Sequence, residues 1–255
     1  MKKIAQILGG LSAVIAMEST FAQDLQVPGS KPINDFYVFT EGGAAYMPNV
    51  GFKDATFISG SILGNNFSLG WSDFNLSTNL GYNVTAGFGY SFNKNISLEL
   101  EAGFIQNTIP SYSANLDATW NGTSGSLNGV TVPVSGAYFQ QIPICVNFVV
   151  CNPDLQVRPM VGIGLGFAPT KMELGTYTAD FTAIGGDTVS LDLGSYTANP
   201  FLIKLKAGLG YSVNPNMDIG IRFFANILTG SDFGSGLKTD VYGVVGANAN
   251  LTVRF

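Results

Sequence analysis

Histidine is absent from all 255 residues of the chain. Most hydrolytic triads use an imidazole as their base, and many zinc sites use it as a ligand. The missing histidine therefore excludes these sites in their usual forms. We expect no enzymatic activity, no metal site and no cofactor.

Charge is also scarce, because Lys, Arg, Asp and Glu make up only 11% of the residues. A soluble globular protein carries about 25%. Acidic residues outnumber basic ones by 17 to 12, which argues against nucleic acid as a partner, since nucleic-acid binding needs basic surface. The only cysteines, Cys145 and Cys151, would lie about 20 Å apart along a straight strand, so we expect both to be unpaired.

Long hydrophobic runs are missing after residue 22. Lys2 and Lys3, a mostly apolar stretch over 4–17 and a small-x-small site before Gln23 predict a signal peptide at 1–22. The apolar stretch is shorter than the roughly 20 residues of a spanning helix, which disfavours a membrane anchor. Residues 23–34 are expected to form a periplasmic segment, and residues 35–255 a single domain.

Alternating apolar and polar residues recur in eight segments, each long enough for the roughly 9–11 residues of a tilted transmembrane strand. The segments span residues 35–46, 78–92, 96–106, 136–149, 155–168, 201–213, 217–228 and 242–255. Short turns at 93–95, 150–154 and 214–216 alternate with long loops at 47–77, 107–135, 169–200 and 229–241. This asymmetry is typical of an outer-membrane barrel with periplasmic turns and extracellular loops.

The two faces of these segments differ in chemistry. In 201–213 the odd positions are apolar, whereas the even ones include Lys204 and Lys206. The face with polar residues collects nine charges: Glu41, Glu99, Glu101, Arg158, Lys204, Lys206, Asp218, Arg222 and Arg254. A soluble barrel would enclose the apolar face, but its aromatic residues are too bulky for a narrow interior. We therefore predict an all-β fold, an eight-stranded antiparallel transmembrane β-barrel with the nine charges in its lumen.

Aromatic spacing independently supports the outward apolar face. Pairs ten residues apart occur at Phe36/Tyr46, Tyr82/Phe92, Tyr138/Phe148 and Phe201/Tyr211. Ten tilted residues rise about 25 Å, the height of the apolar band between two aromatic girdles. Alternation also continues in the third loop, at Val189, Leu191 and Leu193, so the fifth and sixth strands are expected to extend beyond the bilayer. A ten-stranded barrel remains the alternative.

Four stretches carry a resemblance to a known family: VRPMVGIGLGF (157–167), FLIKLKAGLGYSVN (201–214), DIGIRFF (218–224) and NLTVRF (250–255). The chain resembles the small eight-stranded outer-membrane β-barrel proteins, of the opacity or small-porin type. The resemblance implies the bacterial outer membrane as location, and its lipid and assembly machinery as partners. It also implies that Leu251, Val253 and Phe255 form the signal which that machinery reads.

The lumen charges are expected to pair with one another, because charges in a narrow, poorly hydrated interior need partners. Catalysis by Glu99 and Glu101, or an ion path, is the less favoured interpretation. Gly162, Gly164 and Gly166 repeat with a period of two inside a strand, which does not match a dinucleotide-binding loop; we expect such glycines to make room for long charged side chains.

We therefore expect a monomer whose role is structural and surface-interacting, with long loops that contact an extracellular ligand or host surface. The alternative is a narrow porin-like channel for small solutes. An eight-stranded interior is just wide enough for side chains to fill, which disfavours the channel.

Overall fold

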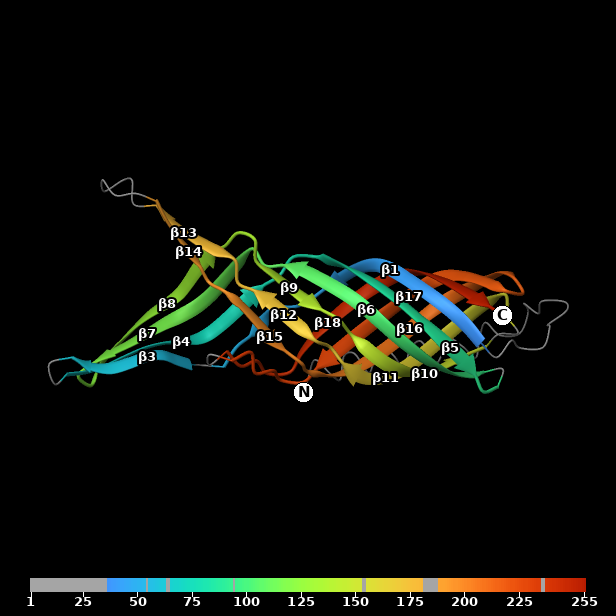
Figure 1. Ribbon diagram of the computed structural model, residues 1–255, viewed down its shortest axis with the longest axis horizontal. Helices are drawn as coiled ribbons and strands as arrows, with labels where there is room; N and C mark the ends of the chain where they lie inside the picture. The colour runs from blue at the N-terminus through green and yellow to red at the C-terminus, as the bar shows by residue number, and fades with distance from the viewer. Residues whose placement is uncertain are drawn as a thin grey trace.

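The computed structural model describes residues 36–53, 55–62, 65–93, 95–152, 155–180, 188–234 and 237–255. The expected signal peptide (1–22) and periplasmic segment (23–34) lie outside the described residues. Within these ranges the regular structure is β-strand, and no helix is present that could span a membrane. The molecule is elongated, with a barrel at one end and β-hairpins projecting from the other (Figure 1).

Eight of the described strands close into an antiparallel barrel, which confirms the eight-stranded prediction and not the ten-stranded alternative. They are β1 (Phe36–Tyr46), β5 (Gly81–Ser91), β6 (Ile96–Thr108), β10 (Ile144–Cys151), β11 (Val157–Phe167), β16 (Phe201–Asn214), β17 (Met217–Leu228) and β18 (Tyr242–Arg254). The first and last strands pair along ten residue positions, from Tyr37↔Arg254 to Tyr46↔Val245. No edge is therefore left at the junction of the two chain ends.

Three barrel strands continue past the barrel after a break at a proline. Beyond Pro143, Pro169 and Pro200 lie β9 (Tyr138–Gln141), β12 (Thr170–Glu173) and β15 (Ser195–Ala198). Proline has no N–H to donate to the ladder, yet the proline carbonyls accept bonds from Gly103, Ile142 and Ala168 at 2.8, 2.9 and 3.1 Å. Pairing keeps one register on both sides of this proline seam (Pro143, Pro169 and Pro200). β12 and β15 extend the fifth and sixth barrel strands, β11 and β16, as the alternation in the third loop predicted.

The pairing shifts by ten residues around the barrel. Directly paired residues can be followed around the barrel from Gly43 in both directions. One path crosses β5 and β6 and ends at Gln141, and the other crosses β18, β17, β16 and β11 and ends at Cys151. The two end points lie in the continuous β9–β10 strand, ten residues apart. For eight strands about 4.8 Å apart with a rise of about 3.3 Å per residue, this shift gives a tilt of about 40° and a backbone radius of about 8 Å. Side chains can fill an interior of this width.

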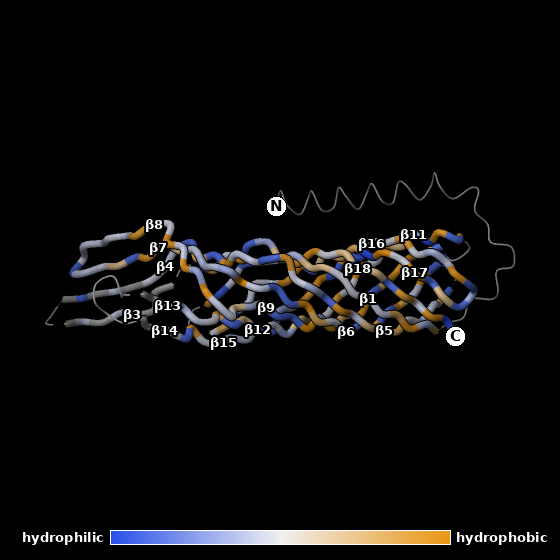
Figure 2. The backbone as a smooth tube through the Cα atoms, turned by 90° about the horizontal axis from the view of Figure 1, so that it is seen from above, coloured by the Kyte–Doolittle hydropathy of each residue, from blue (hydrophilic) through white to orange (hydrophobic). Residues whose placement is uncertain are grey.

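The outer wall of the barrel is apolar, as predicted. Buried and exposed residues alternate along its strands, and the exposed ones include Phe36, Leu165, Leu209 and Phe223. Seven of the eight paired aromatics are exposed; Tyr138 is half-buried because Lys171 lies 5.5 Å from its ring centroid. Hydrophobic residues concentrate in the barrel half of the molecule (Figure 2). We call the end with the short connections the turn end and the opposite end the loop end.

The first two long loops do connect successive barrel strands, and they are themselves largely β-structure. β2 (Val50–Gly51), β3 (Ala55–Ile62), β4 (Asn65–Ser77), β7 (Ser111–Trp120) and β8 (Thr123–Pro133) form a second sheet, the loop sheet. A separate hairpin joins β13 (Thr176–Asp180) to β14 (Thr188–Asp192). The loop sheet buries one apolar face at its base, where Tyr112 is 6% exposed, and such a sheet tolerates the Ser, Thr and Asn that suggested loops.

Candidate functional site

The middle of the lumen holds six of the nine predicted charges in one connected group, the central charge cluster. Lys206 Nζ lies 2.8 Å from a Glu99 oxygen and 2.6 Å from a Glu101 oxygen. Lys204 also pairs with Glu101. On β17, the strand next to β16, Arg222 Nη1 lies 2.7 Å from Glu41. The sequence brings these residues together because β1, β6, β16 and β17 each direct alternate side chains inward.

Longer contacts tie the ion pairs of the central charge cluster together. Lys206 Nζ lies 3.7 Å from Glu41, and Arg222 Nη1 lies 3.6 Å from Glu99. Three carboxylates therefore meet three basic side chains, and every one of the six is at least nine-tenths buried. Tyr37 and Asn248 each add a 3.0 Å hydrogen bond, donated to Glu99 and Glu41. Balanced charge with added hydrogen bonds is what makes such deep burial tolerable.

The remaining three predicted charges form a separate group, the turn-end trio of Arg158, Asp218 and Arg254. Arg158 donates to both oxygens of Asp218 at 2.6 and 2.8 Å. Arg254 donates twice to one of these oxygens, at 3.1 and 2.9 Å. Their side chains are 7–14% exposed, so the trio is closer to solvent than the central charge cluster. A cavity of about 40 Å³ lies between the two groups.

Two aromatic rings inside the lumen were not predicted. The ring centroid of Phe39 lies 5.0 Å from Lys206 Nζ and 5.0 Å from Arg222 Cζ, and Tyr37 lies 5.1 Å from Arg254 Cζ. Cations over aromatic faces are attracted to them. The neighbouring strand makes room, since Gly87 is paired with Phe39 and Gly89 with Tyr37, and a Cβ at either glycine would strike the ring.

The glycines of the lumen therefore make room for aromatic rings as well as for charged side chains. A Cβ at Gly208 would approach Arg222 closely, in line with the expectation that glycines make room for long charged side chains. At Gly87 and Gly89 the neighbour is an aromatic ring instead. The pairing of two glycines with two aromatic residues on adjacent strands was the signal in the sequence that could have found them.

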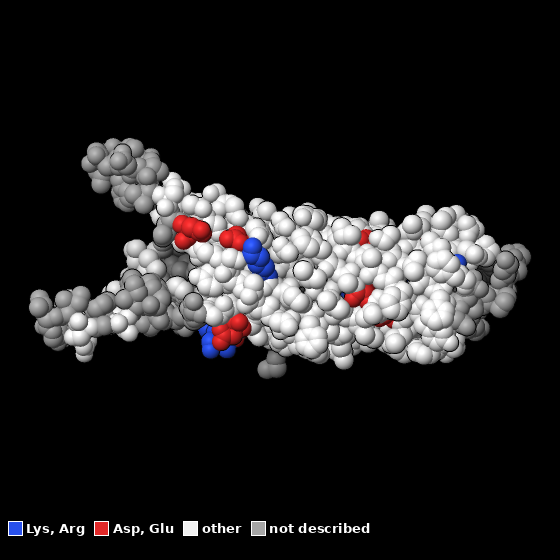
Figure 3. All heavy atoms as spheres, in the orientation of Figure 1, with Lys and Arg blue, Asp and Glu red and all other residues white. Residues whose placement is uncertain are grey.

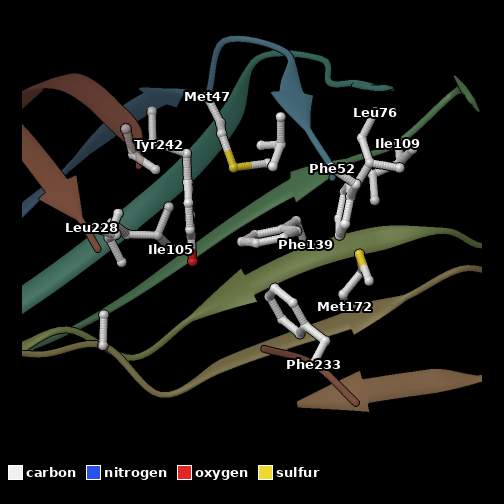
Figure 4. Close-up of a cluster of buried hydrophobic side chains, with 14 of the residues drawn as sticks. Met47, Phe52, Leu76, Ile105, Ile109, Phe139, Met172, Leu228, Phe233 and Tyr242 are labelled. Carbon is white, nitrogen blue, oxygen red and sulfur yellow. The ribbon is translucent and has the colours of Figure 1, made fainter. Parts of the chain in front are cut away.

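Aromatic and aliphatic side chains fill the loop end of the lumen and form an apolar plug (Figure 4). Phe139 of β9 is 1% exposed. Its ring lies 6.1 Å from that of Phe233 and 5.8 Å from that of Tyr242. Phe52 continues the cluster, 6.3 Å from Phe233. We call the core around Phe52, Phe139, Phe233 and Tyr242 the apolar plug; sequence patterns missed it because several members belong to connecting segments.

Comparison with known families identifies the family to which the chain belongs. The model of the outer membrane protein beta-barrel domain matches residues 44–255. The chain belongs to this family. It is therefore an outer-membrane β-barrel of the Gram-negative type, and the apolar wall of the barrel is its lipid-facing surface.

Solved barrels with a similar course include neisserial surface protein A, 15% identical with a TM-score of 0.46, where the match covers 86% of this chain and 97% of that one. OprG from Pseudomonas aeruginosa is 11% identical with a TM-score of 0.39, covering 88% and 99% of the two chains. The protease OmpT from Escherichia coli is 10% identical with a TM-score of 0.44, covering 90% and 99%. No curated protein matches the chain.

Both cysteines of this outer-membrane barrel are unpaired, as expected. Cys145 lies inside the lumen, where its thiol donates to Glu101 at 3.3 Å. Cys151 is the last residue of β10, at the turn end. In the part of the chain that the structure describes, no group of three acidic, cysteine or histidine side chains is arranged to hold a metal ion.

Charges on the outside of the outer-membrane barrel lie beyond the apolar wall. On the face shown in Figure 3 they gather where the barrel meets its loop extensions. Lys53 pairs with Asp240 at 3.4 Å, and Lys171 with Glu173 at 2.9 Å. In the fourth loop Lys238 pairs with Asp232 at 3.0 Å. The Gly234 N–H and the Lys238 ammonium hold the pKa of Asp232 below its ordinary value.

Proposed function

We propose that this outer-membrane barrel has no enzymatic activity and acts as a scaffold that presents the loop sheet at the cell surface. One observation carries the proposal: the loop sheet is folded structure that projects beyond the lipid-facing wall, and the apolar plug fixes its base. Residues 1–22 serve as signal peptide, 23–34 as periplasmic segment and 35–255 as barrel. The turn end faces the periplasm, and the loop end faces the exterior.

The lumen supports a non-enzymatic role. Glu99 and Glu101, the only carboxylates that the sequence suggested for acid–base chemistry, each bind a buried lysine. A catalytic carboxylate must reach a substrate, whereas these two are at most 2% exposed. We therefore assign the nine lumen residues a structural role, with no cofactor and no metal.

Two successive obstructions disfavour the alternative of a narrow channel. A solute would have to pass both the central charge cluster and the apolar plug within a barrel of about 8 Å backbone radius. Planar-bilayer recordings of refolded protein should therefore show no stable unitary current. Currents that change in Glu99→Gln or Lys204→Gln would establish the channel instead.

The final strand supports the proposed assembly signal. Leu251 and Phe255 are 39% and 67% exposed on the outer wall, and Val253 shares their face. The N–H of Phe255 donates to the Phe36 carbonyl at 3.1 Å, next to the seam that closes the barrel. Deleting Phe255 should reduce the amount of heat-modifiable barrel in outer-membrane fractions, because the assembly machinery would read an incomplete signal. Normal assembly of this variant would refute the assignment.

The surface role is tested by shortening the loop sheet without touching the barrel. Residues 115–129 of the β7–β8 hairpin are replaced by a two-residue Asn-Gly turn, a sequence suited to tight hairpins. Expressing cells should lose adherence to epithelial cells, matrix-coated surfaces or one another, while boiled and unboiled protein still migrate differently on a denaturing gel. Unchanged adherence on all three would refute the proposal. Within one membrane we expect a monomer with lipid as its neighbour, and no nucleic-acid partner.

A further inference from the structure

β8 forms an open edge of the loop sheet. Among the described strands it pairs with β7 alone, and residues 123–129 are all exposed. Edge strands usually carry charged residues or prolines that block further pairing. β8 carries no charge, and its only proline, Pro133, lies at the barrel-side end. The bulge that shifts its register falls after Leu127, so 123–127 is a regular, unprotected edge.

The turn before β8 determines which backbone groups point away from β7. Asn121 and Gly122 have φ of 47° and 81°, as in the two-residue turn that twists with its strands. The flanking pair Trp120↔Thr123 is then hydrogen-bonded, and hydrogen-bonded pairs alternate along the ladder. Gly125 and Leu127 therefore bond to β7. Ser124 and Ser126 direct their N–H and C=O groups to the open side.

An exposed apolar surface lies beside this edge. Trp120, Leu127 and Leu116 share one face of the hairpin and are 51%, 62% and 37% exposed. With their neighbours they line an open groove of about 900 Å³. The groove continues, at the far end of the loop sheet, the face that is buried around Tyr112 at the base.

We propose that the open edge of β8 binds the β8 edge of a second copy of this chain. In antiparallel pairing about a two-fold axis at Gly125, Ser124 of each copy meets Ser126 of the other. All four outward-directed serines thereby exchange backbone hydrogen bonds. Thr123 then faces Leu127 of the second copy, so the exposed apolar faces of the two hairpins join side by side on one face of the merged sheet.

Charge and hydrogen-bonding capacity favour a second copy as the occupant. The open edge presents N–H and C=O groups at strand spacing, which an extended peptide matches and lipid does not. The region 111–133 contains a single charged residue, Asp117. In the pair the two Asp117 residues lie three strand spacings apart and two residues apart along the strands, a distance of about 16 Å. This exceeds the Debye length of about 8 Å at physiological salt, so self-pairing meets little repulsion.

The direction of β8 determines where the second copy lies. The β7–β8 hairpin projects along the long axis of the molecule, with its turn far from the barrel (Figures 1 and 2). Antiparallel pairing of two β8 strands therefore points the two barrels in opposite directions. Copies in one membrane point the same way, so the paired copies lie in two facing membranes. The inference rests on the proposed function, and names a neighbouring cell with the same protein as the contacted surface.

Vesicle clustering tests this inference with the full chain. Lipid vesicles that contain the refolded protein should cluster, measured by light scattering, whereas empty vesicles should not. Ser126→Pro removes an outward N–H that β7 does not use, at a position where an edge strand tolerates proline, so clustering should be lost in a folded barrel. Ser126→Ala keeps the N–H and is the matched control; its clustering should persist. No clustering by the unaltered protein, or clustering that survives Ser126→Pro, would overturn the proposal.

A disulfide reports the register and separates failure of this inference from failure of the proposed function. A Cβ at Gly125 meets no atom within 4 Å, and the residue sits on the proposed two-fold axis. With dissolved oxygen as the oxidant that accepts the two electrons, Gly125→Cys should therefore form a disulfide-linked dimer between differently tagged vesicle populations. A dimer confined to one population, or capture of another protein in its place, contradicts the pairing in facing membranes. On dispersed whole cells treated with a reductant, failure of Gly125→Cys to react with an impermeant maleimide refutes the surface orientation itself.

Discussion

The two halves of the lumen are closed by opposite chemistry. The turn-end half contains ion pairs between side chains of the barrel strands, such as Lys206 with Glu99 and Glu101. The loop-end half contains the apolar plug, to which connecting segments contribute Phe52 and Phe233. Closure by charge therefore depends on strand register, whereas closure by packing depends on how the loops fold. Mutations in the two halves should separate barrel stability from loop order.

The largest effect is expected in the central charge cluster. Lys206→Met leaves three buried carboxylates with two basic partners, and an unpaired buried charge costs about 3–5 kcal/mol. Urea unfolding of the refolded barrel should show this loss of stability. As control, the balanced double change Glu101→Leu with Lys204→Met should cost less than about 2 kcal/mol. Equal costs for the single and double variants would show that charge balance does not stabilise this half.

The next largest effect is expected in the apolar plug. Phe233→Ala removes a ring that is 5% exposed and should cost about 3 kcal/mol, because the remaining cavity lacks contacts. Loss of protection in hydrogen exchange should concentrate in the fourth loop and the loop sheet. Uniform loss throughout the barrel strands would show that the two halves are not independent.

A smaller effect is expected at the turn-end trio. Arg254→Gln removes one of the two arginines on Asp218, but Arg158 keeps its contacts to both oxygens. The loss should be about 1 kcal/mol, since the group is partly hydrated. Arg222→Gln is the matched change in the central charge cluster and should cost several times more in the same urea titration. The reverse order would contradict the difference in burial between the two groups.

The smallest effect is a dependence of the fourth loop on acid. The pKa of Asp232 in the folded loop lies below its ordinary 3.8, because the Gly234 N–H and Lys238 stabilise the carboxylate. A carboxyl group whose pKa is lower in the folded state stabilises the fold at pH values above its ordinary pKa. This stabilisation is lost as the pH falls through the pKa of the folded state. The protection factor of the Leu237 N–H, which compares its exchange with that of an unstructured amide at the same pH, should therefore fall below pH 3.8 and stay constant near neutrality. Asp232→Asn should abolish the change, and an unaltered acid response would refute its cause.

The sequence predicted the barrel because a membrane imposes a strict alternation on every strand that crosses it. The alternation of apolar and polar positions alone placed Lys204, Glu99 and Arg222 on the inward face. The sequence of one strand does not specify which residue of another strand each charge pairs with. The loop sheet escaped prediction because β-strands in water need only one apolar face and tolerate Ser, Thr and Asn. The plug depends on Phe52 and Phe233 meeting Phe139 across long sequence separations, and no local pattern encodes such contacts.

The proline seam makes the molecule divisible. Pro143, Pro169 and Pro200 interrupt three ladders at one level but leave their register unchanged. Everything on the loop side could therefore be exchanged for the extensions of another eight-stranded barrel without a shift in strand pairing below the prolines. Such a boundary would let the loop side change rapidly in sequence among related proteins, while the lipid-embedded barrel keeps the residues of its lumen. For engineering, the same three prolines mark the line along which to graft foreign hairpins onto this barrel.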